Sequence, residues 1–257
     1  MASLEGKRAL VLGVANQRSI AWAITQKLAG EGARVALTFL GDLLEKRVRP
    51  LAEQIGAELV LPCDVSDDAQ IDALFEAVDA EWDGLDILIH AVAFADREDL
   101  MGRFVDTKRD GFRLALDISA YSLIGLARGA LPLMEKAGGG SIITLTYDGS
   151  QRVIPNYNVM GVAKAALESA TRYLAADLGQ QNIRVNAVSP GPIKTLSAAG
   201  IRDFREMLKV AESRSPLGRN VSAQDVAELT ALLAGDGGAG ITGQVLKVDA
   251  GLSILGF

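Results

Sequence analysis

Tyr157 and Lys164 stand seven residues apart, in a segment whose pattern predicts a helix over 157–179. At about 3.6 residues per turn this spacing makes about two turns, so both side chains are expected near one face. A phenol beside an ammonium group is a proton donor next to a positive charge. That pair suits a reaction that builds negative charge on a substrate oxygen. Taken alone, the pair is more simply explained as a packed tyrosine and a solvated lysine, so the rest of the chain must decide.

The composition predicts one soluble globular domain over 1–257. The chain has 257 residues, 49% hydrophobic and 23% charged, and its net charge is −6. An acidic chain argues against nucleic acid or an anionic membrane as the main partner. With one cysteine, Cys63, and one histidine, His90, an internal disulfide is impossible and we expect no metal site. We find no long apolar run and no room for a signal peptide before Arg8, which predicts a cytoplasmic protein with no membrane segment.

Short apolar segments alternate with helical patterns along the whole chain. Near-continuous apolar runs such as 9–12 are typical of parallel strands that are covered on both faces. The alternation predicts the α/β class: a Rossmann-like, doubly wound parallel sheet of about seven strands in a single domain. We expect strands at 8–13, 34–39, 58–61, 86–91, 141–146, 184–188 and 244–248, and helices at 19–30, 43–54, 67–81, 109–135, 157–179 and 223–234.

The first strand runs into a turn that contains Gly13, Ser19 and Ile20. In a doubly wound sheet, this turn is where a dinucleotide pyrophosphate meets the amino end of a helix. Gly13 would let the backbone approach the cofactor, and Ser19 could cap the helix and donate to phosphate. The full glycine fingerprint is missing, so an ordinary capped strand-to-helix turn remains an equal alternative.

Two further strand ends are compatible with a nucleotide. Asp64, followed by Val65, could accept from an adenine amino group, and Ala91 begins a run of small residues where a backbone could lie against a ring. His90, just before this run, is interpreted as a structural histidine at a strand end. These features extend the candidate cofactor site across the carboxyl edge of the sheet.

The end of the second strand bears on the choice between NADH and NADPH. An acid there holds the ribose hydroxyls, whereas an arginine accommodates the extra phosphate of NADPH. The segment 37–42 offers neither at the strand tip, and Lys46 and Arg47 come only later in the next helix. The absence of an adjacent base favours NADH, with NADPH less suited.

Together these residues resemble the NADH-dependent enoyl-acyl carrier protein reductases, a divergent branch of the short-chain dehydrogenase/reductases. The resemblance covers essentially the whole chain and includes a tyrosine ten residues before Tyr157. Ordinary members of the superfamily pair a tyrosine with a lysine four residues later, but here position 161 is glycine. The motifs that carry the resemblance are Gly13 with Ser19-Ile20-Ala21, Cys63-Asp64-Val65, Tyr147, Pro155–Gly161, Lys164 and Ser189–Thr195.

The resemblance implies a role for each matching residue. Tyr157 would stabilise an oxyanion, Lys164 would hold the nicotinamide ribose, and Tyr147 would line the acyl pocket, where it could equally be a simple wall. Ile193 and Thr195 would lie around the nicotinamide amide. The other pocket positions would be Ala95, Leu100, Met160, Phe204 and Met207.

Three residues depart from the family pattern. Asp148 follows Tyr147, where a small or apolar residue is more familiar, Pro190 stands where alanine is common, and Leu40 replaces a commonly polar residue near the adenosine. Leu40 puts the NADH preference in question. None of these changes removes a group that the chemistry needs.

The implied reaction is reduction of a trans-2-enoyl thioester of fatty-acid synthesis by NADH. Hydride would reach the β-carbon while Tyr157 stabilises the enolate oxygen. One alternative is a carbonyl-reducing enzyme of the same superfamily, with Thr144 or Thr146 in place of its serine, although Gly161 removes its lysine. The other is a catalytically silent NAD(H)-binding regulator, although such a protein would tend to lose the Tyr157–Lys164 pair.

The resemblance also implies partners. The stretch 194–220 is predicted to be a helical substrate lid, and its charged residues sum to +3. Arg202, Arg205 and Lys209 would share a basic face that meets acyl carrier protein, with an ordinary solvated surface helix as the alternative. The uncharged tail 250–257 would pack in the interface of a homotetramer or, alternatively, on the chain's own core.

Overall fold

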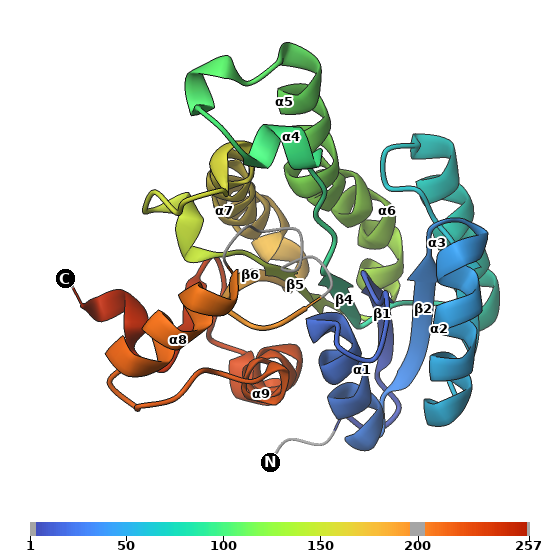
Figure 1. Cartoon of the computed structure of the whole chain (residues 1–257). Helices are drawn as coiled ribbons and strands as arrows, with labels where there is room; N and C mark the ends of the chain where they lie inside the picture. The colour runs from blue at the N-terminus through green and yellow to red at the C-terminus, as the bar shows by residue number, and fades with distance from the viewer. Residues whose placement is uncertain (1–3, 196–203, 256–257) are drawn as a thin grey trace.

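A parallel sheet forms the centre of the molecule (Figure 1). The computed structural model describes residues 4–195 and 204–255, without the side chain of Arg205. Seven strands pair in the order β3-β2-β1-β4-β5-β6-β7, each parallel to its neighbours. The predicted fold class is confirmed, with strand ends shifted by a few residues at most. The strands are β1 Arg8–Leu12, β2 Arg34–Phe39, β3 Leu59–Pro62, β4 Ile87–His90, β5 Gly140–Leu145, β6 Ile183–Pro190 and β7 Val245–Val248.

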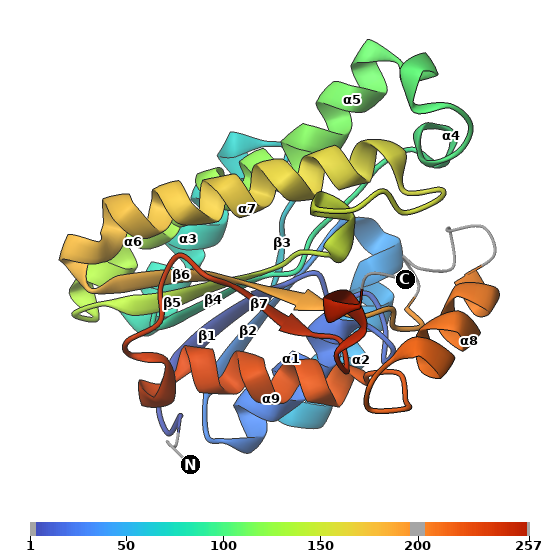
Figure 2. The same ribbon diagram turned by 90° about the vertical axis from the view of Figure 1, so that its left-hand side faces the viewer.

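Helices cover both faces of the sheet, as near-continuous apolar strands require. One core joins the sheet to α3, α6 and α7, and the other joins it to α1, α2 and α9 (Figure 2). The short helix α4 was not predicted. The helices are α1 Ile20–Gly30, α2 Gly41–Ile55, α3 Asp68–Trp82, α4 Arg97–Leu100, α5 Arg109–Leu116, α6 Ser122–Lys136, α7 Asn158–Leu178, α8 Phe204–Arg214 and α9 Ala223–Ala234.

The expected helix over 109–135 is a compound element. A π-helical turn, Asp117–Tyr121, separates α5 from α6. By length and composition the whole stretch Arg109–Lys136 could cross a membrane, with a mean hydropathy of 1.3 in its most apolar window. Charged residues such as Asp117 and Arg128 interrupt it, so no continuous apolar run results. Half of that window is buried inside the protein, and core helices of soluble proteins pass the same test, so the stretch is weak evidence for a membrane span.

The strand order reverses direction at β1, whose neighbours are β2 and β4. In open α/β sheets, ligands bind at the carboxyl ends of the strands beside such a point. Gly13 follows β1 with a φ of +104°, and a Cβ there would lie 2.2 Å from the carbonyl oxygen of Ala91. Glycine is therefore required for the close approach of the β1 and β4 ends, which form one rim of the crevice.

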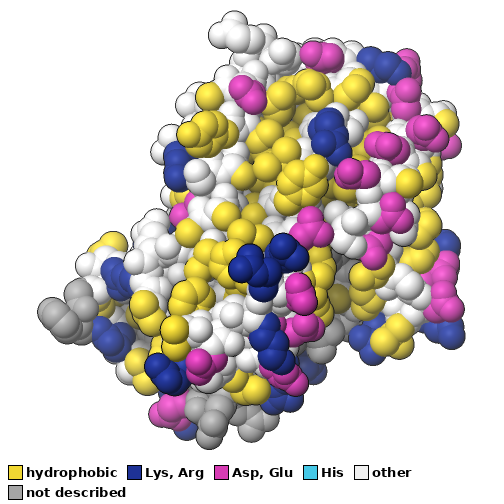
Figure 3. Space-filling model, turned by 90° about the horizontal axis from the view of Figure 1, so that it is seen from above, with side chains coloured by type: hydrophobic (Ala, Val, Ile, Leu, Met, Phe, Trp, Pro, Cys, Tyr) yellow, Lys and Arg dark blue, Asp and Glu magenta, His cyan; other side chains and the backbone are white. Residues whose placement is uncertain are grey.

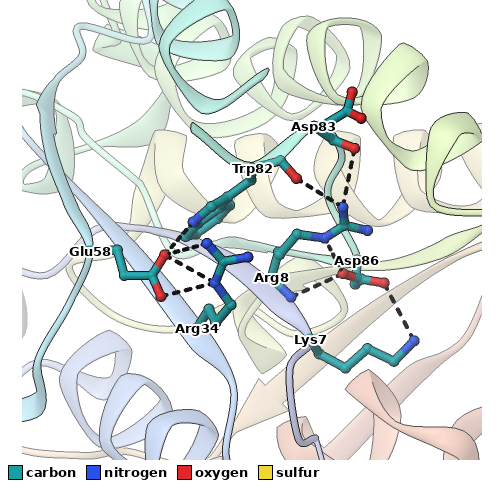
Figure 4. Close-up of polar contacts among 7 residues, drawn as sticks. All are labelled: Lys7, Arg8, Arg34, Glu58, Trp82, Asp83 and Asp86. Atoms are coloured by element: carbon teal, nitrogen blue, oxygen red, sulfur yellow. Dashed lines mark hydrogen bonds and ion pairs between the residues drawn. The ribbon is translucent and has the colours of Figure 1, made fainter. Parts of the chain in front are cut away.

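The opposite, amino edge of the sheet is held by two charged clusters (Figure 4). Asp86 accepts from the backbone N–H of Arg8 at 3.0 Å and from its Nε at 2.7 Å. Glu58 accepts from Arg34 and from Trp82 Nε1, the latter at 2.6 Å. These contacts link the starts of the central strands to the end of α3, far from the carboxyl edge.

Candidate active site

A cavity of about 440 Å³ opens at the carboxyl edge of the sheet. The structure brings most of the predicted site residues to its wall, from segments far apart in the sequence. Their presence there does not test their roles, which stay predictions. The predicted residues that line it are Gly13, Ser19, Ile20, Ala91, Ala95, Leu100, Tyr147, Tyr157, Met160, Lys164, Ile193, Thr195 and Phe204.

Tyr157 and Lys164 both reach the cavity from α7. The helix begins at Asn158, so Tyr157 is its N-cap residue and not a helical one as predicted. The rings of Tyr157 and Tyr147 meet edge to face, with centroids 5.1 Å apart. Lys164 is 5% exposed, and its Nζ donates to the carbonyl oxygen of Leu145 at 2.8 Å.

Burial sets the protonation of these groups. It raises the pKa of Tyr157 far above the ordinary value and that of Tyr147 to about 12, so both phenols keep their protons. Burial also lowers the pKa of Lys164 to about 8, although nearby Glu168 opposes this shift. The site therefore offers two phenolic donors beside an amine that is mostly protonated at neutral pH.

The packing around Gly161 shows why no lysine stands four residues after the tyrosine. A Cβ at Gly161 would lie 2.7 Å from the carbonyl oxygen of Gly149, in the 3₁₀ turn Asp148–Ser150. No side chain fits there without a shift of the backbone. A lysine four residues after Tyr157 is therefore excluded by packing as well as by sequence.

The threonines that could serve a carbonyl reductase are already engaged. Thr146 Oγ1 donates to Glu168 Oε1 at 2.7 Å. Thr144 Oγ1 lies 2.8 Å from His90 Nδ1 and is fully buried. Neither hydroxyl is free to polarise a substrate carbonyl, which counts against that alternative.

Comparison with known proteins decides the family. Residues 13–253 match the family model described as enoyl-(acyl carrier protein) reductase. This chain belongs to that family. It is 52% identical to the enoyl-acyl-carrier-protein reductase (NADH) of Synechocystis sp., with 100% of both chains covered. It is also 52% identical to enoyl-acyl-carrier-protein reductase (NADH) 1 of Rhizobium meliloti, covering 98% of this chain and 92% of that one.

Solved structures agree with this assignment. The Bacillus cereus enoyl-acyl carrier protein reductase, solved with NADP+ and indole naphthyridinone, superposes with a TM-score of 0.97 at 50% identity, covering 100% of both chains. The Aquifex aeolicus enoyl-acyl-carrier-protein reductase (NADH) gives a TM-score of 0.95 at 47% identity, covering 99% of both. The resemblance read from the motifs is confirmed over the whole reductase chain.

The phosphate end of the reductase site differs from expectation in one detail. Ser19 is the N-cap residue of α1, but its side chain makes no capping bond to the helix. Its Oγ instead accepts from the N–H groups of Ala15 and Asn16, each at 3.0 Å. By accepting these two hydrogen bonds, the Oγ of Ser19 holds the turn in place. The O–H of Ser19 remains the group that could donate to phosphate.

Asp64 and Val65 do not line the cavity. They follow β3 on the same edge of the sheet, and Asp64 Oδ1 accepts from both the N–H and the Oγ of Ser66. This bonding shapes the turn before α3. The adenine role predicted for Asp64 stays untested.

The interpretation of His90 as a structural histidine placed it, partly buried, at a strand end, whereas the structure buries it fully. Ser122 donates to the carbonyl oxygen of Ile118 at 2.7 Å, so it accepts from His90 Nε2, 2.8 Å away. Nδ1 then accepts from Thr144. Burial lowers the pKa of His90 to about 3, so the ring is neutral and ties β4 to β5 and α6.

Only part of the predicted lid is described. Phe204, at the start of α8, lines the cavity, and Tyr147 Oη donates to Met207 Sδ at 3.7 Å, so Met207 touches a wall residue without lining the cavity itself. Arg202 and the side chain of Arg205 lie outside the described residues. Lys209 lies 3.5 Å from Glu206, and both side chains are exposed.

Three residues of the reductase site were not predicted from the sequence. Two of them, Phe94 and Arg97, line the cavity from the segment between β4 and α5, where the sequence has no periodic pattern. Glu168 is 6% exposed behind Lys164. Its spacing of four residues from Lys164 was the available signal, since it places both side chains on one helix face.

The departure from the family pattern at Asp148 also has a physical explanation. Asp148 lies 2.9 Å from Lys247 Nζ on β7 and 3.6 Å from Arg152 Nε. The carboxylate is thus the counter-ion of two cations. Asp148 therefore ties the segment after β5 to the far edge of the sheet.

Proposed function

We propose that this protein reduces the trans-2 double bond of enoyl thioesters carried by acyl carrier protein, with NADH as reductant, in fatty-acid synthesis. The observation that carries the proposal is that Tyr157 and Lys164 line the same cavity. The chain in which they do so belongs to the enoyl-acyl carrier protein reductase family. The relatives named above as NADH enzymes support the choice of cofactor. The absence of a base at the end of β2 is consistent with it.

Bound NADH would supply the hydride that reaches the β-carbon of the substrate. Tyr157 donates a hydrogen bond to the thioester oxygen, where negative charge develops as the enolate forms. Lys164 holds the ribose of the cofactor, and its positive charge lowers the energy of the nearby enolate. A proton from Tyr157 or from water then reaches the α-carbon.

Different segments of the chain would bind different parts of the cofactor. Gly13, Ser19 and Ile20 form the turn that receives the pyrophosphate at the amino end of α1. Ala91 leaves room for the ring system, and Ile193 with Thr195 flanks the nicotinamide amide. Ala95, Leu100, Met160 and Phe204 supply the walls against which an acyl chain packs.

A coupled assay tests this proposal. NADH consumption is followed with crotonyl thioester and, in parallel, with acetoacetyl thioester. We expect turnover of the first only, because the hydroxyls of Thr144 and Thr146 are engaged elsewhere and Gly161 removes the lysine that a carbonyl reductase uses. Turnover of acetoacetyl thioester alone would favour the carbonyl-reducing alternative, and NADH binding without any turnover would favour the silent regulator.

The same assay with NADPH tests the cofactor preference. We expect a lower kcat/KM with NADPH, because no base adjoins the tip of β2. Lys46 and Arg47 are exposed on α2, one turn further on. Equal or better kcat/KM with NADPH would contradict the preference and would implicate these two residues.

We further propose a cytoplasmic homotetramer whose lid, approximately 194–220, meets acyl carrier protein. An apolar groove lies between α5, α6 and α7, and Tyr121 and Ile124 are exposed beside it. Hydrophobic side chains gather on the face of the molecule seen in Figure 3, which supports association. In the tail, Arg152 donates to the carbonyl oxygens of Ser253 and Leu255, while Ile254 is 77% exposed. The described tail is thus held by its own chain and still presents Ile254 to a neighbour. Size-exclusion chromatography with light scattering would measure the molar mass of the protein in solution and so test the oligomeric state.

A further inference from the structure

A carboxylate is buried directly behind the cavity, and the proposed reaction makes no use of it. Glu168 lies four residues after Lys164 on α7 and is 6% exposed. Its Oε1 accepts from Thr146 Oγ1 at 2.7 Å and from Ser150 Oγ at 2.6 Å. A buried charge is costly unless nearby groups compensate it, so its position calls for a reason.

The two hydroxyls that Glu168 binds flank Tyr147 in the sequence. Lys164, one turn earlier on the same helix face, donates to the carbonyl oxygen of Leu145 at 2.8 Å. Glu168 and Lys164 therefore both hydrogen-bond the segment 145–150 from α7. Gly149 lies so close that a Cβ there would be 2.6 Å from the ring of Tyr157.

We propose that Glu168 is a positioning residue: its carboxylate anchors the segment that carries Tyr147 and supplies the counter-charge that keeps the ammonium of Lys164 charged inside the protein. The inference rests on the proposed function, in which Lys164 holds the cofactor ribose. Glu168 touches neither substrate nor cofactor in this arrangement. It acts through Lys164, Thr146 and Ser150.

Among the groups around Lys164, Glu168 is the one whose negative charge raises the pKa of the lysine. Burial lowers the pKa of Lys164 to about 8, and the charge of Glu168 opposes that shift. His90, on β4, is neutral because burial lowers its pKa to about 3. Burial raises the pKa of Tyr147 to about 12 and raises that of Tyr157 further, so neither phenol ionises near neutral pH. Arg97 also lines the cavity, from α4.

Glu168→Gln tests the electrostatic part, because it removes the charge and keeps an oxygen that can accept from both hydroxyls. NADH binding is measured by fluorescence titration between about pH 6 and pH 9. In the native protein, Kd should rise above about pH 8 as Lys164 loses its proton, by at most about tenfold per pH unit. In Glu168→Gln the rise should begin at lower pH, with Kd unchanged near pH 6. Asp177→Asn, an exposed carboxylate on the same helix, should leave the profile in place.

Ser150→Ala tests the anchoring part, because it removes one tether and keeps the charge. We expect kcat on an enoyl thioester to fall several-fold while the pH profile of NADH binding stays native. Glu168→Asp, which keeps the charge with a shorter reach, should behave like Ser150→Ala, and it serves if the glutamine variant does not fold.

Two results would overturn the inference. A native rise near pH 8 that does not move in Glu168→Gln would reject the role of Glu168 and leave the proposed function standing. A native protein without that rise, indistinguishable from Lys164→Ala, would reject the cofactor role of Lys164 and the inference with it. The binding readout needs no enoyl substrate, so failure of the proposed reaction itself would appear separately in the coupled assay.

Discussion

At the scale of single residues, the site depends on what burial does to a phenol and an amine. The phenols of Tyr157 and Tyr147 are held protonated, and Lys164 loses its proton more readily than an exposed lysine. Desolvation is the main cause in each case. The same burial strengthens a hydrogen bond to a developing oxyanion, because little water competes for the charge.

Tyr157→Phe should keep the fold and lose the donor to the enolate. Removal of one such donor lowers kcat by about 10²–10³. NADH affinity should be nearly unchanged, because the hydroxyl is assigned to the substrate. Steady-state kinetics with crotonyl thioester and a fluorescence titration with NADH measure the two quantities. Full kcat in the folded variant would show that the assigned role is wrong.

Lys164→Ala should weaken NADH binding near pH 7, where most of the native lysine is charged. A charge-assisted hydrogen bond is worth about 1.5–3 kcal/mol, so Kd should rise about tenfold or more. Because the pKa of Lys164 is about 8, the native advantage is present below that pH and is lost as pH rises through it. Titrations at several pH values should converge for the two proteins at high pH. Equal affinities at pH 7 would place Lys164 outside the cofactor site.

At the scale of elements, α7 is the part that organises the site. It carries Tyr157 at its N-cap, and Lys164 and Glu168 at successive turns. Its close packing against the 3₁₀ turn Asp148–Ser150 fixes the second tyrosine, Tyr147, next to the first. This contact depends on glycine at 161, since a Cβ there would meet the carbonyl oxygen of Gly149.

Gly161→Ala should therefore destabilise the protein although alanine favours helices. Overpacking costs about 1–3 kcal/mol, more than the gain in helix propensity. Urea unfolding measures the change, and kcat should fall as well because the segment with Tyr147 is displaced. Gly179→Ala, just after α7, is the control: its Cβ would meet nothing within 4 Å. Gly161→Ala with native stability and kcat would reject the packing argument.

At the scale of the whole molecule, the two edges of the sheet have separate tasks. The carboxyl edge holds the cavity, whereas the amino edge is tied by Asp86 with Arg8 and by Glu58 with Arg34. Burial tends to raise the pKa of Asp86, but hydrogen bonds from Arg8 outweigh it and leave the pKa lowered. The amino edge can therefore contribute to stability without taking part in the chemistry.

Asp86→Asn should lower stability by about 2 kcal/mol, the scale of a hydrogen bond to a charged group, and leave kcat unchanged. A carboxylate with a lowered folded-state pKa stabilises above its unfolded value of about 3.9, and that contribution is lost as pH falls through the folded value. The difference between native and variant proteins should thus be full at pH 7 and shrink below about pH 4. Urea unfolding at both pH values measures it. A loss of kcat with native stability would contradict this division of the sheet.

The sequence by itself determined the fold class, the seven strands and the family. Buried parallel strands need continuous apolar runs, and these are visible in the chain without any neighbour. The spacing of Tyr157, Gly161 and Lys164 is likewise a property of one segment. These features are local, so pattern and motif were sufficient to find them.

Only the tertiary structure decided how distant segments share groups. The bonds of Thr146 and Ser150 to Glu168, and of Lys247 to Asp148, join residues 18 to 99 positions apart. The Oγ of Ser19 accepts hydrogen bonds from the N–H groups of the preceding loop. The carboxylate of Asp64 accepts hydrogen bonds within its own turn and does not line the cavity. A side chain's partner depends on which competing donor or acceptor the fold brings within about 3 Å, and no periodicity records that distance.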